Sequence, residues 1–165
     1  MIINVYSYKD AENQVILNKN KRKNWISIRD FGYEHLYSKF DELCKKNILI
    51  INFDDVTKFN EHHHLMHPFY ETLATKRDLI HFNNEMAEKI IEFAYDINNK
   101  NEELNIHCWA GKSRSQAVGY CLNQYFNLYL NNNKIDFIMN IENSMDKFIG
   151  NYDVIKIMEK TLYVQ

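Results

Sequence analysis

The chain has 165 residues, of which 45% are hydrophobic, and its formal net charge is −2. This size fits one domain with enough apolar mass for a core, so we expect a single domain over residues 1–165. The near-neutral charge argues against bulk attraction to nucleic acid or to an anionic membrane. No apolar run reaches membrane-spanning length, and three irregularly spaced cysteines do not suit a disulfide framework. These features predict a protein of a reducing, cytoplasmic compartment.

The first half of the chain alternates between strand and helix patterns. The expected elements, in order, are a strand over 2–6, a helix over 9–17, a strand over 25–30, a helix over 34–46 and a strand over 48–53. The last of these is the most continuous apolar run, so we predict that it lies in the centre of a parallel sheet. It ends at Asp54 and Asp55. Active sites of open α/β sheets lie at the carboxyl ends of strands, so these carboxylates are well placed for chemistry.

A polar and aromatic connection without clear period follows, from residue 57 to residue 78. Plain loops of this length are uncommon in compact domains, which favours a lid or a substrate-facing segment. The connection holds histidines at positions 62, 63, 64 and 67, a run that suggests a metal site. Because consecutive residues cannot all face one ion and no second ligand cluster accompanies them, we expect no metal there.

The second half of the chain continues the alternation. We expect a helix over 82–97, a strand over 104–108, a helix over 116–130, and further helices over 135–145 and 152–163. Strands that alternate with helices predict an α/β fold, with a mainly parallel sheet of about four to five strands and helices on both faces. Cys44 and Cys121 lie on apolar helical faces, which predicts that they pack in the core.

The strand over 104–108 ends at Cys108, and a loop of small residues then leads to Arg114. Five residues separate the two, which is the length of a phosphate-sized loop. Backbone N–H groups of such a loop, at the start of a helix, can converge on an anion. Arg114 adds a planar fork of donors that matches phosphate oxygens, and this electropositive setting favours the nucleophilic thiolate form of cysteine. The sequence therefore predicts cleavage of a phosphate ester through a phosphocysteine.

The stretch His-Cys-Trp-Ala-Gly-Lys-Ser-Arg-Ser, residues 107–115, resembles the His-Cys-x5-Arg-Ser/Thr signature of the cysteine-dependent protein tyrosine and dual-specificity phosphatase superfamily. The segments WISIRD and ILIINFDD further resemble compact bacterial and phage-type members. The resemblance implies a phosphatase-like fold without a cofactor, in which Ser115 helps the cysteine sulfur to leave and His107 tunes the thiol. It also implies that the loop binds the substrate phosphate through Trp109, Ala110, Gly111, Lys112, Ser113 and Arg114.

The resemblance implies, in addition, a general acid on an aspartate that follows the strand before the last helix–strand unit. Asp54 and Asp55 occupy that place. The number of residues that usually separates the general acid from the cysteine in the family instead points to Asp78, which lies 30 residues before Cys108. We favour Asp55 or Asp54, because the strand-end argument is geometric, and we keep Asp78 as the alternative. One of the first two is expected to serve only as a cap.

The sequence leaves several substrates open. No phosphotyrosine-clamping segment is recognisable before the site, which favours a shallow, dual-specificity-like cleft and a phosphorylated protein as the partner. Lys112 within the loop resembles phosphoinositide-directed relatives, because an added cation suits a polyanionic head group. Phosphoinositides, inositol phosphates and RNA 5′-phosphates are therefore alternative substrates.

Two rival functions use the same residues without phosphatase chemistry. The first is a non-catalytic phosphate-binding module, against which the intact set of Cys108, Arg114 and Ser115 argues. The second is a thiol redox protein or arsenate reductase. That chemistry needs a second cysteine near Cys108, and Cys121 on a core face serves poorly.

Overall fold

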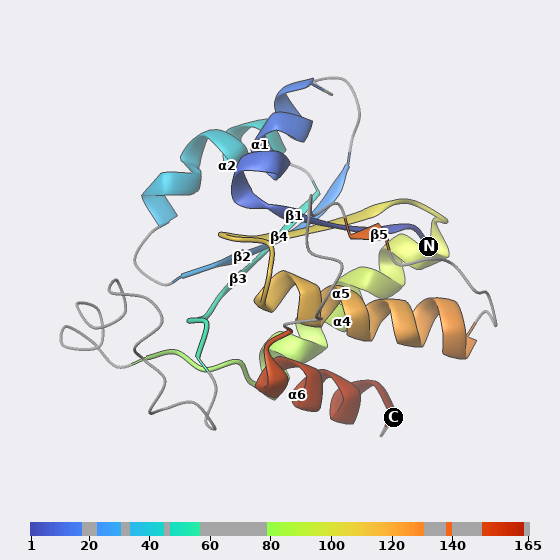
Figure 1. The fold of residues 1–165 in the computed structure, drawn as a ribbon. Coiled ribbons are helices and arrows are strands. Elements are labelled where there is room, and N and C mark those ends of the chain that lie inside the picture. The colour runs from blue at the N-terminus through green and yellow to red at the C-terminus, as the bar shows by residue number, and fades with distance from the viewer. Residues whose placement is uncertain are drawn as a thin grey trace.

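A computed structural model of the chain describes residues 1–17, 23–30, 34–44, 47–56, 79–130, 138–139 and 150–163. Within these ranges, five parallel strands form one sheet in the order β3-β2-β4-β1-β5 (Figure 1). The strands are β1 (Ile3–Ser7), β2 (Asn24–Arg29), β3 (Ile48–Asn52), β4 (Leu104–Cys108) and β5 (Ile138–Met139). The predicted parallel sheet is confirmed.

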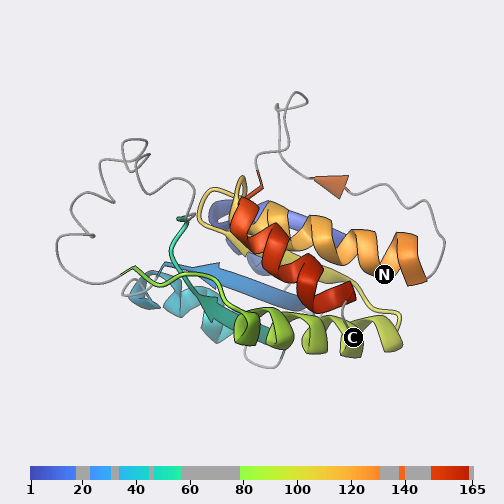
Figure 2. The ribbon, with the colours of Figure 1, turned by 90° about the horizontal axis from the view of Figure 1, so that it is seen from below.

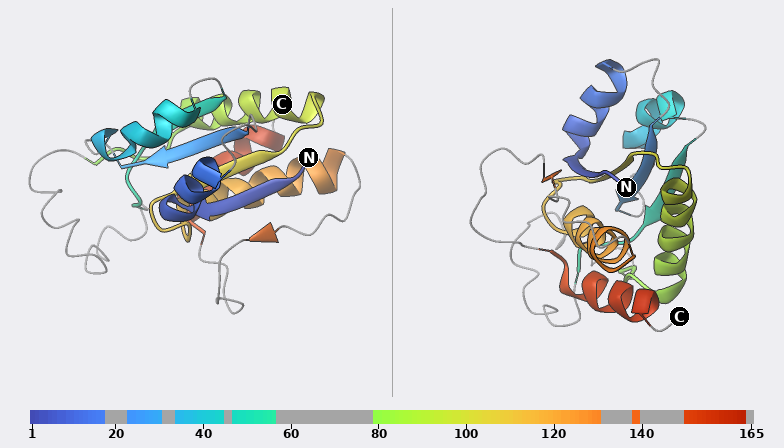
Figure 3. Two further views of the ribbon diagram at one scale, coloured as in Figure 1. Left: turned by 90° about the horizontal axis from the view of Figure 1, so that it is seen from above. Right: turned by 90° about the vertical axis from the view of Figure 1, so that its right-hand side faces the viewer.

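Helices cover both faces of this sheet, as predicted (Figures 1 and 2). On one face lie α1 (Tyr8–Leu17), the 3₁₀ turn η1 (Glu34–Tyr37) and α2 (Ser38–Cys44). On the other face lie α4 (Asn84–Asn99), α5 (Arg114–Asn123) and the π-helical segment η4 (Gln124–Leu130) that continues α5. The last helix, α6 (Tyr152–Tyr163), packs against α4 and α5 as an outer layer (Figure 3). None of the helices in the described ranges has the length and hydropathy that crossing a bilayer requires.

The strands bury side chains on both faces, which divides the core in two. Alternation along β2 sends Ile26 and Ile28 into the larger cluster beneath α4, α5 and α6, and sends Trp25 into the smaller cluster beneath α1 and α2.

The helix α4 shows how the local sequence determines where a helix begins and which of its residues are buried. Its side-chain cap is Asn83, which accepts a hydrogen bond of 3.0 Å from the Met86 nitrogen. Its apolar residues at helical spacing are then buried in the larger cluster.

The strand over residues 48–53 is not central, and that prediction is wrong. β3 forms an edge of the sheet and pairs with β2 alone among the described strands. Ile51 is buried, whereas Ile50 is 41% exposed. The run is continuously apolar because Ile48 packs on the smaller cluster and Leu49 on the larger one. An edge strand that contacts helices on both faces thus has the same apolar pattern as a central one.

The helix predicted over residues 135–145 is also wrong at its centre. Ile138 and Met139 form β5, which pairs in parallel with Asn4 and Val5 of β1. The other residues of that segment lie outside the described ranges. At these two positions the backbone extends the far edge of the sheet instead of forming the predicted helix.

Candidate active site

The carboxyl ends of β1 to β4 meet at one edge of the sheet. Parallel pairing places Ser7 beside Cys108 and Arg29 beside Asn52, so the four strands end close together. Residues that directly follow these strands gather at this edge. They are Tyr8 after β1, Asp30 after β2, Asp54 and Asp55 shortly after β3, and the loop of residues 109–113 after β4.

The loop of residues 109–113 rests on the end of β1. Gly111 has φ +70°, and a Cβ atom there would lie only 2.6 Å from the backbone nitrogen of Ser7. Only glycine combines this left-handed conformation with so close a backbone approach. The backbone nitrogen of Tyr8 also donates a hydrogen bond of 3.1 Å to the Trp109 oxygen. The loop is therefore fixed to its neighbouring strand by main-chain contacts.

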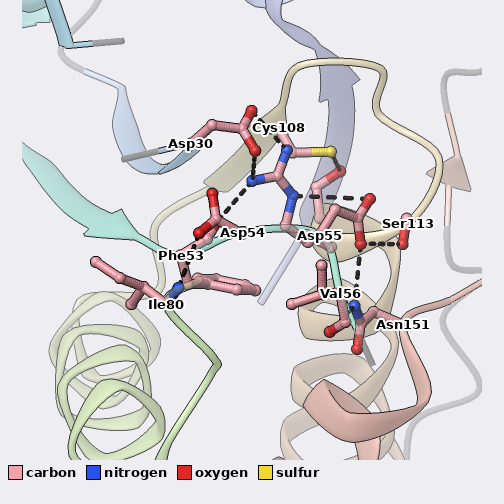
Figure 4. A network of polar contacts seen from close by, with 11 residues as sticks. Asp30, Phe53, Asp54, Asp55, Val56, Ile80, Cys108, Ser113 and Asn151 are labelled. Atoms are coloured by element: carbon pink, nitrogen blue, oxygen red, sulfur yellow. Dashed lines mark hydrogen bonds and ion pairs between the residues drawn. The ribbon is translucent and has the colours of Figure 1, made fainter. Parts of the chain in front are cut away.

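Cys108 is the last residue of β4, and its side chain lies at the base of this loop. The residue is only 2% exposed, and its sulfur lies 3.1 Å from the hydroxyl oxygen of Ser115 (Figure 4). Ser115 is buried in the first turn of α5. A hydroxyl at this distance can donate a hydrogen bond to a thiolate, which stabilises the charged form of the sulfur.

Arg114 is buried and is held by groups from two other strand ends. Its Nη1 and Nη2 atoms donate to the two carboxylate oxygens of Asp30 at 2.9 and 3.1 Å, and Nη1 also donates to the Phe53 oxygen at 2.7 Å. Its Nε lies 3.8 Å from Oδ2 of Asp55. These contacts fix the plane of the guanidinium group and compensate a buried charge. Asp30 was not among the predicted site residues, although its place at a strand end was visible in the sequence.

The consecutive residues Asp54 and Asp55 have different surroundings (Figure 4). Asp54 is fully buried and turns toward Ile80, whose backbone nitrogen donates to Oδ2 at 2.8 Å. Asp55 turns toward the loop, and its Oδ1 accepts a hydrogen bond of 2.7 Å from the Ser113 hydroxyl. The carboxylate of Asp54 thus binds the main chain 26 residues further along, while that of Asp55 lies beside Arg114. Asp78, the alternative general acid, lies outside the described residues.

Asn151, at the start of α6, was also missed by the sequence analysis. Its Nδ2 donates to Oδ1 of Asp55 at 3.0 Å, and its Oδ1 accepts a hydrogen bond from the Val154 nitrogen at 3.2 Å. Its backbone nitrogen donates to the Ser113 oxygen at 3.4 Å. One side chain therefore caps α6 and holds Asp55 at the same time. A Gly-Asn pair before an apolar helical pattern indicates the cap, but no local pattern indicates the contact with Asp55.

His107 precedes the nucleophile and lies on the other side of β4. Its ring is fully buried among aromatic side chains, with centroid distances of 4.8 Å to Phe40 and 6.1 Å to Tyr37. Burial, with the nearby Arg29 and Arg114 cations, lowers the pKa of His107 to about 3. The imidazole is therefore neutral, so the ring does not act on the thiol through a positive charge.

The remaining loop residues present a mixed surface. Trp109, Ala110 and Lys112 are exposed, and Ser113 is half-buried.

The four histidines between positions 62 and 67, which suggested a metal site, lie outside the described residues. Elsewhere, in the ranges that the structure covers, no group of three or more His, Cys, Asp or Glu side chains could hold a metal ion.

The other two cysteines have inert surroundings. Burial and the Asp41 carboxylate raise the pKa of Cys44 to about 12, and burial together with Glu159 does the same for Cys121. Thiols that stay protonated at neutral pH are poor nucleophiles. Cys121 lies in the larger core cluster, as predicted, and Cys44 is half-buried against the smaller one.

A comparison with solved structures found a similar fold. The crystal structure of Tk-PTP in the active form matches with a TM-score of 0.50 over 97% of this chain and 92% of that chain. The chain has the fold of this protein tyrosine phosphatase. The sequence identity is 13%, so the likeness concerns the fold. No protein-family model and no curated protein matches the sequence. The phosphatase-like fold predicted from the motif at residues 107–115 is confirmed.

Proposed function

We propose that the chain is a phosphomonoester hydrolase that acts through a phosphocysteine intermediate, with a phosphorylated protein as its substrate. One observation carries the proposal. The Cys108 sulfur, 3.1 Å from the Ser115 hydroxyl, lies at the base of a loop that ends in a buried, oriented Arg114. A nucleophile, an anion cradle and a hydroxyl that assists the sulfur are the parts that this chemistry needs.

In the first step, the thiolate of Cys108 attacks phosphorus in line and the ester bond to the leaving oxygen breaks. Arg114 and the amides of the loop bind the equatorial oxygens, where negative charge is stabilised in the transition state. The carboxyl group of Asp55 donates a proton to the leaving alkoxide or phenoxide. The products of this step are the free alcohol or phenol and a phosphocysteine.

In the second step, water attacks the phosphocysteine and the sulfur leaves as a thiolate. Asp55, now a carboxylate, accepts the proton of the water. Ser115 donates a hydrogen bond to the departing sulfur and so stabilises the charge that develops there. The enzyme returns to its starting state, and inorganic phosphate is released.

We assign the general acid to Asp55 because of where its carboxylate lies. Its Oδ2 is 3.8 Å from Nε of Arg114, which places it beside the phosphate cradle. Asp54 is fully buried, and its Oδ2 accepts a hydrogen bond from the Ile80 backbone. A group that transfers a proton must come within hydrogen-bond reach of the leaving oxygen, which favours the partly exposed carboxylate of Asp55 over the fully buried one of Asp54.

The test is hydrolysis of an aryl phosphate by the wild-type chain and by a Cys108→Ser variant. We expect turnover that vanadate blocks and that EDTA leaves unchanged. The substitution should reduce kcat by at least about 10⁴-fold while binding of a phosphate mimic persists. Cys44→Ser is the matched control, because the raised pKa of that thiol excludes it from the chemistry. Activity that survives in Cys108→Ser but disappears with EDTA would contradict the phosphocysteine mechanism.

A second candidate substrate class has one observation in its favour. Lys112 is an exposed cation within the loop, and an additional cation suits a substrate that carries several phosphates. A panel of phosphopeptides, phosphoinositides and 5′-triphosphorylated RNA separates the classes by kcat/KM. The highest kcat/KM on a phosphopeptide supports the proposed function; a preference of more than tenfold for either polyanion transfers the assignment to that class.

A further inference from the structure

We propose that Ser113 is a positioning residue for the general acid, and that Ser113 and Asn151 together reserve Oδ2 of Asp55 for proton transfer. The three residues Asp55, Ser113 and Asn151 are called the acid clamp below. The inference rests on the proposed phosphatase function and deepens it, because it names the oxygen that carries the proton and the side chains that hold it. The resemblance at residues 107–115 implied only a phosphate-binding role for Ser113.

The first observation is the direction of the Ser113 hydroxyl. Ser113 begins α5, and serine is favoured at this position because its side-chain oxygen can accept a hydrogen bond from the first turn of the helix. The side chain of Ser113 makes no such bond. Its hydroxyl instead donates to Oδ1 of Asp55 at 2.7 Å, across 58 positions of the chain. A local preference that is given up for a distant contact is typical of a functional site.

The second observation is that Oδ1 of Asp55 accepts two hydrogen bonds (Figure 4). Besides the Ser113 hydroxyl, Nδ2 of Asn151 donates to it at 3.0 Å. A carboxyl oxygen has two lone pairs, so these two donors fill Oδ1. A proton on this carboxyl group is therefore carried by Oδ2.

The third observation is the place of Oδ2 itself. It lies 3.8 Å from Nε of Arg114, and the side chain of Asp55 is 25% exposed. In the proposed reaction Arg114 binds the equatorial oxygens of the phosphate, so the oxygen beside Arg114 is the one that comes close to the bound ester. A proton donor has to be within hydrogen-bond reach of the leaving oxygen. The acid clamp thus turns the proton-bearing oxygen toward the substrate.

The main chain braces the acid clamp. The Ser113 oxygen accepts hydrogen bonds from the Ala117 nitrogen at 3.0 Å and from the Asn151 nitrogen at 3.4 Å. Oδ1 of Asn151 accepts a hydrogen bond from the Val154 nitrogen at 3.2 Å. The clamp therefore joins the acid to the first turns of α5 and α6. Because Ser113 belongs to the loop that binds the phosphate, its hydrogen bond to Asp55 also sets how far the acid lies from that phosphate.

The reserved oxygen serves both steps of the reaction. In the first step the leaving oxygen keeps the electrons of its bond to phosphorus and takes the proton from Oδ2, which leaves Asp55 as a carboxylate. In the second step Oδ2 accepts a proton from the attacking water, while the Cys108 sulfur leaves with the electrons of the phosphorus–sulfur bond. Oδ1 stays bonded to Ser113 and Asn151 throughout. The carboxyl group is thus already oriented for each transfer.

The test is the ratio of kcat/KM on an alkyl phosphate to kcat/KM on an aryl phosphate, which does not depend on the folded fraction of a variant. Because an alkoxide needs a proton to leave and a phenoxide does not, Ser113→Ala should lower this ratio by about 10- to 100-fold. Ser113→Thr retains the hydroxyl and should keep the wild-type ratio. Ser7→Ala is the matched control, because it removes a serine–aspartate hydrogen bond, to Asp10, at the start of α1. It should leave the ratio unchanged.

A second measurement separates positioning of the acid from support of the loop. In an Asp55→Asn background, Ser113→Ala should lower the ratio no further, because no proton is left to position. An equal loss of kcat/KM on both esters in Ser113→Ala overturns the inference, as does a lower ratio that persists in the Asp55→Asn background. If Ser113→Ala does not fold, Asn151→Ser removes the other donor to Oδ1. A wild-type ratio in that variant overturns the inference as well.

The same measurements distinguish this inference from the proposed function. If the wild-type chain hydrolyses neither ester, the phosphatase assignment is wrong and the acid clamp falls with it. If the chain hydrolyses both esters through Cys108 and the ratio is the same in Ser113→Ala as in the wild type, the function stands and only the inference fails.

Discussion

The loop of residues 109–113 has two sides that differ in composition and in the way that they are held. Its polar side consists of Asp30, Asp55, Ser113, Arg114 and Asn151, which are joined by hydrogen bonds and ion pairs. Its aromatic side consists of Tyr8, Tyr37, Phe40, His107 and Trp109, which are joined by ring contacts. The charged groups that the proposed reaction uses lie on the polar side.

The end of β2 supplies one charge to each side. Arg29 turns to the aromatic side, where it is paired with Asp41 and bonded to Ser27, and Asp30 turns to the polar side, where it is paired with Arg114. Each side thus contains one buried arginine with a carboxylate partner. Burial and pairing with a carboxylate therefore do not show which of the two arginines takes part in the proposed reaction. Arg114 differs from Arg29 in that it directly follows the loop of residues 109–113.

The largest expected effect is the loss of the arginine fork on the polar side. Arg114→Lys should lower kcat/KM for an aryl phosphate by about 10³- to 10⁵-fold, because lysine offers a point charge and cannot bind two phosphate oxygens in a plane. Arg29→Lys is the matched variant on the aromatic side. It should lower the free energy of unfolding yet change kcat/KM by less than about tenfold. Steady-state kinetics and urea unfolding of both variants check this, and equal kinetic losses would contradict the division of roles.

The second effect concerns the two consecutive aspartates. Asp55→Asn should lower kcat by about 10²- to 10⁴-fold on alkyl phosphates and by much less on aryl phosphates, because phenoxide leaves without a proton. Asp54→Asn should instead reduce the free energy of unfolding by about 1–3 kcal/mol, since a buried hydrogen-bond acceptor is altered. Its loss of activity should not depend on the leaving group. A flat response of Asp55→Asn across leaving groups would rule it out as the general acid.

A smaller effect is expected at Asn151, which holds Asp55 from α6. Asn151→Ser keeps a helix cap but removes the amide donor to Asp55, so kcat on alkyl phosphates should fall by about 10- to 100-fold. Aryl phosphates should be affected less, as with Asp55→Asn. Asn83→Ser at the start of α4 is the control for capping alone and should leave the kinetics unchanged. A loss that is the same for both ester types would mean that Asn151 supports only the helix.

The smallest effect is a dependence of stability on pH from the aromatic side. The pKa of His107 is about 3 in the folded chain, against 6.5 for the ordinary imidazole. Below pH 6.5 the unfolded chain binds a proton that the folded chain does not, so stability is present above that pH and is lost as the pH falls toward 3. Between pH 7 and pH 5 this costs about 2 kcal/mol of unfolding free energy. Urea unfolding of His107→Phe should show a shallower loss over the same range, and an identical loss would contradict this origin.

Much of the fold was predictable because its signals are local. The strand β4, the helix α6 and the loop that ends at Arg114 each follow from residues that are adjacent in the chain. The position of β3 at an edge and the strand at Ile138 were not predictable in this way. Both depend on which strand pairs with which, and that information lies in contacts between distant segments.

The candidate site also contains contacts that local sequence predicts and contacts between distant segments that it does not. Cys108 and Ser115 lie seven residues apart, and the motif that contains them predicted their closeness. Asp30 meets Arg114 across 84 residues, and Asn151 meets Asp55 across 96. The position of Asp30 at a strand end gave a signal that could have placed it at the site. The sequence near Asn151 shows only a helix cap, since its second hydrogen bond depends on how α6 packs.

The contacts of Asn151 have a consequence for how the protein is made. A nascent chain that has emerged as far as α5 already contains the nucleophile, the arginine and both aspartates. It lacks α6, which packs on α4 and α5 and supplies the hydrogen bond to Asp55. The geometry of the proposed acid is thus completed only when the last helix docks, so catalytic competence on alkyl esters should appear late in synthesis, after phosphate binding has become possible.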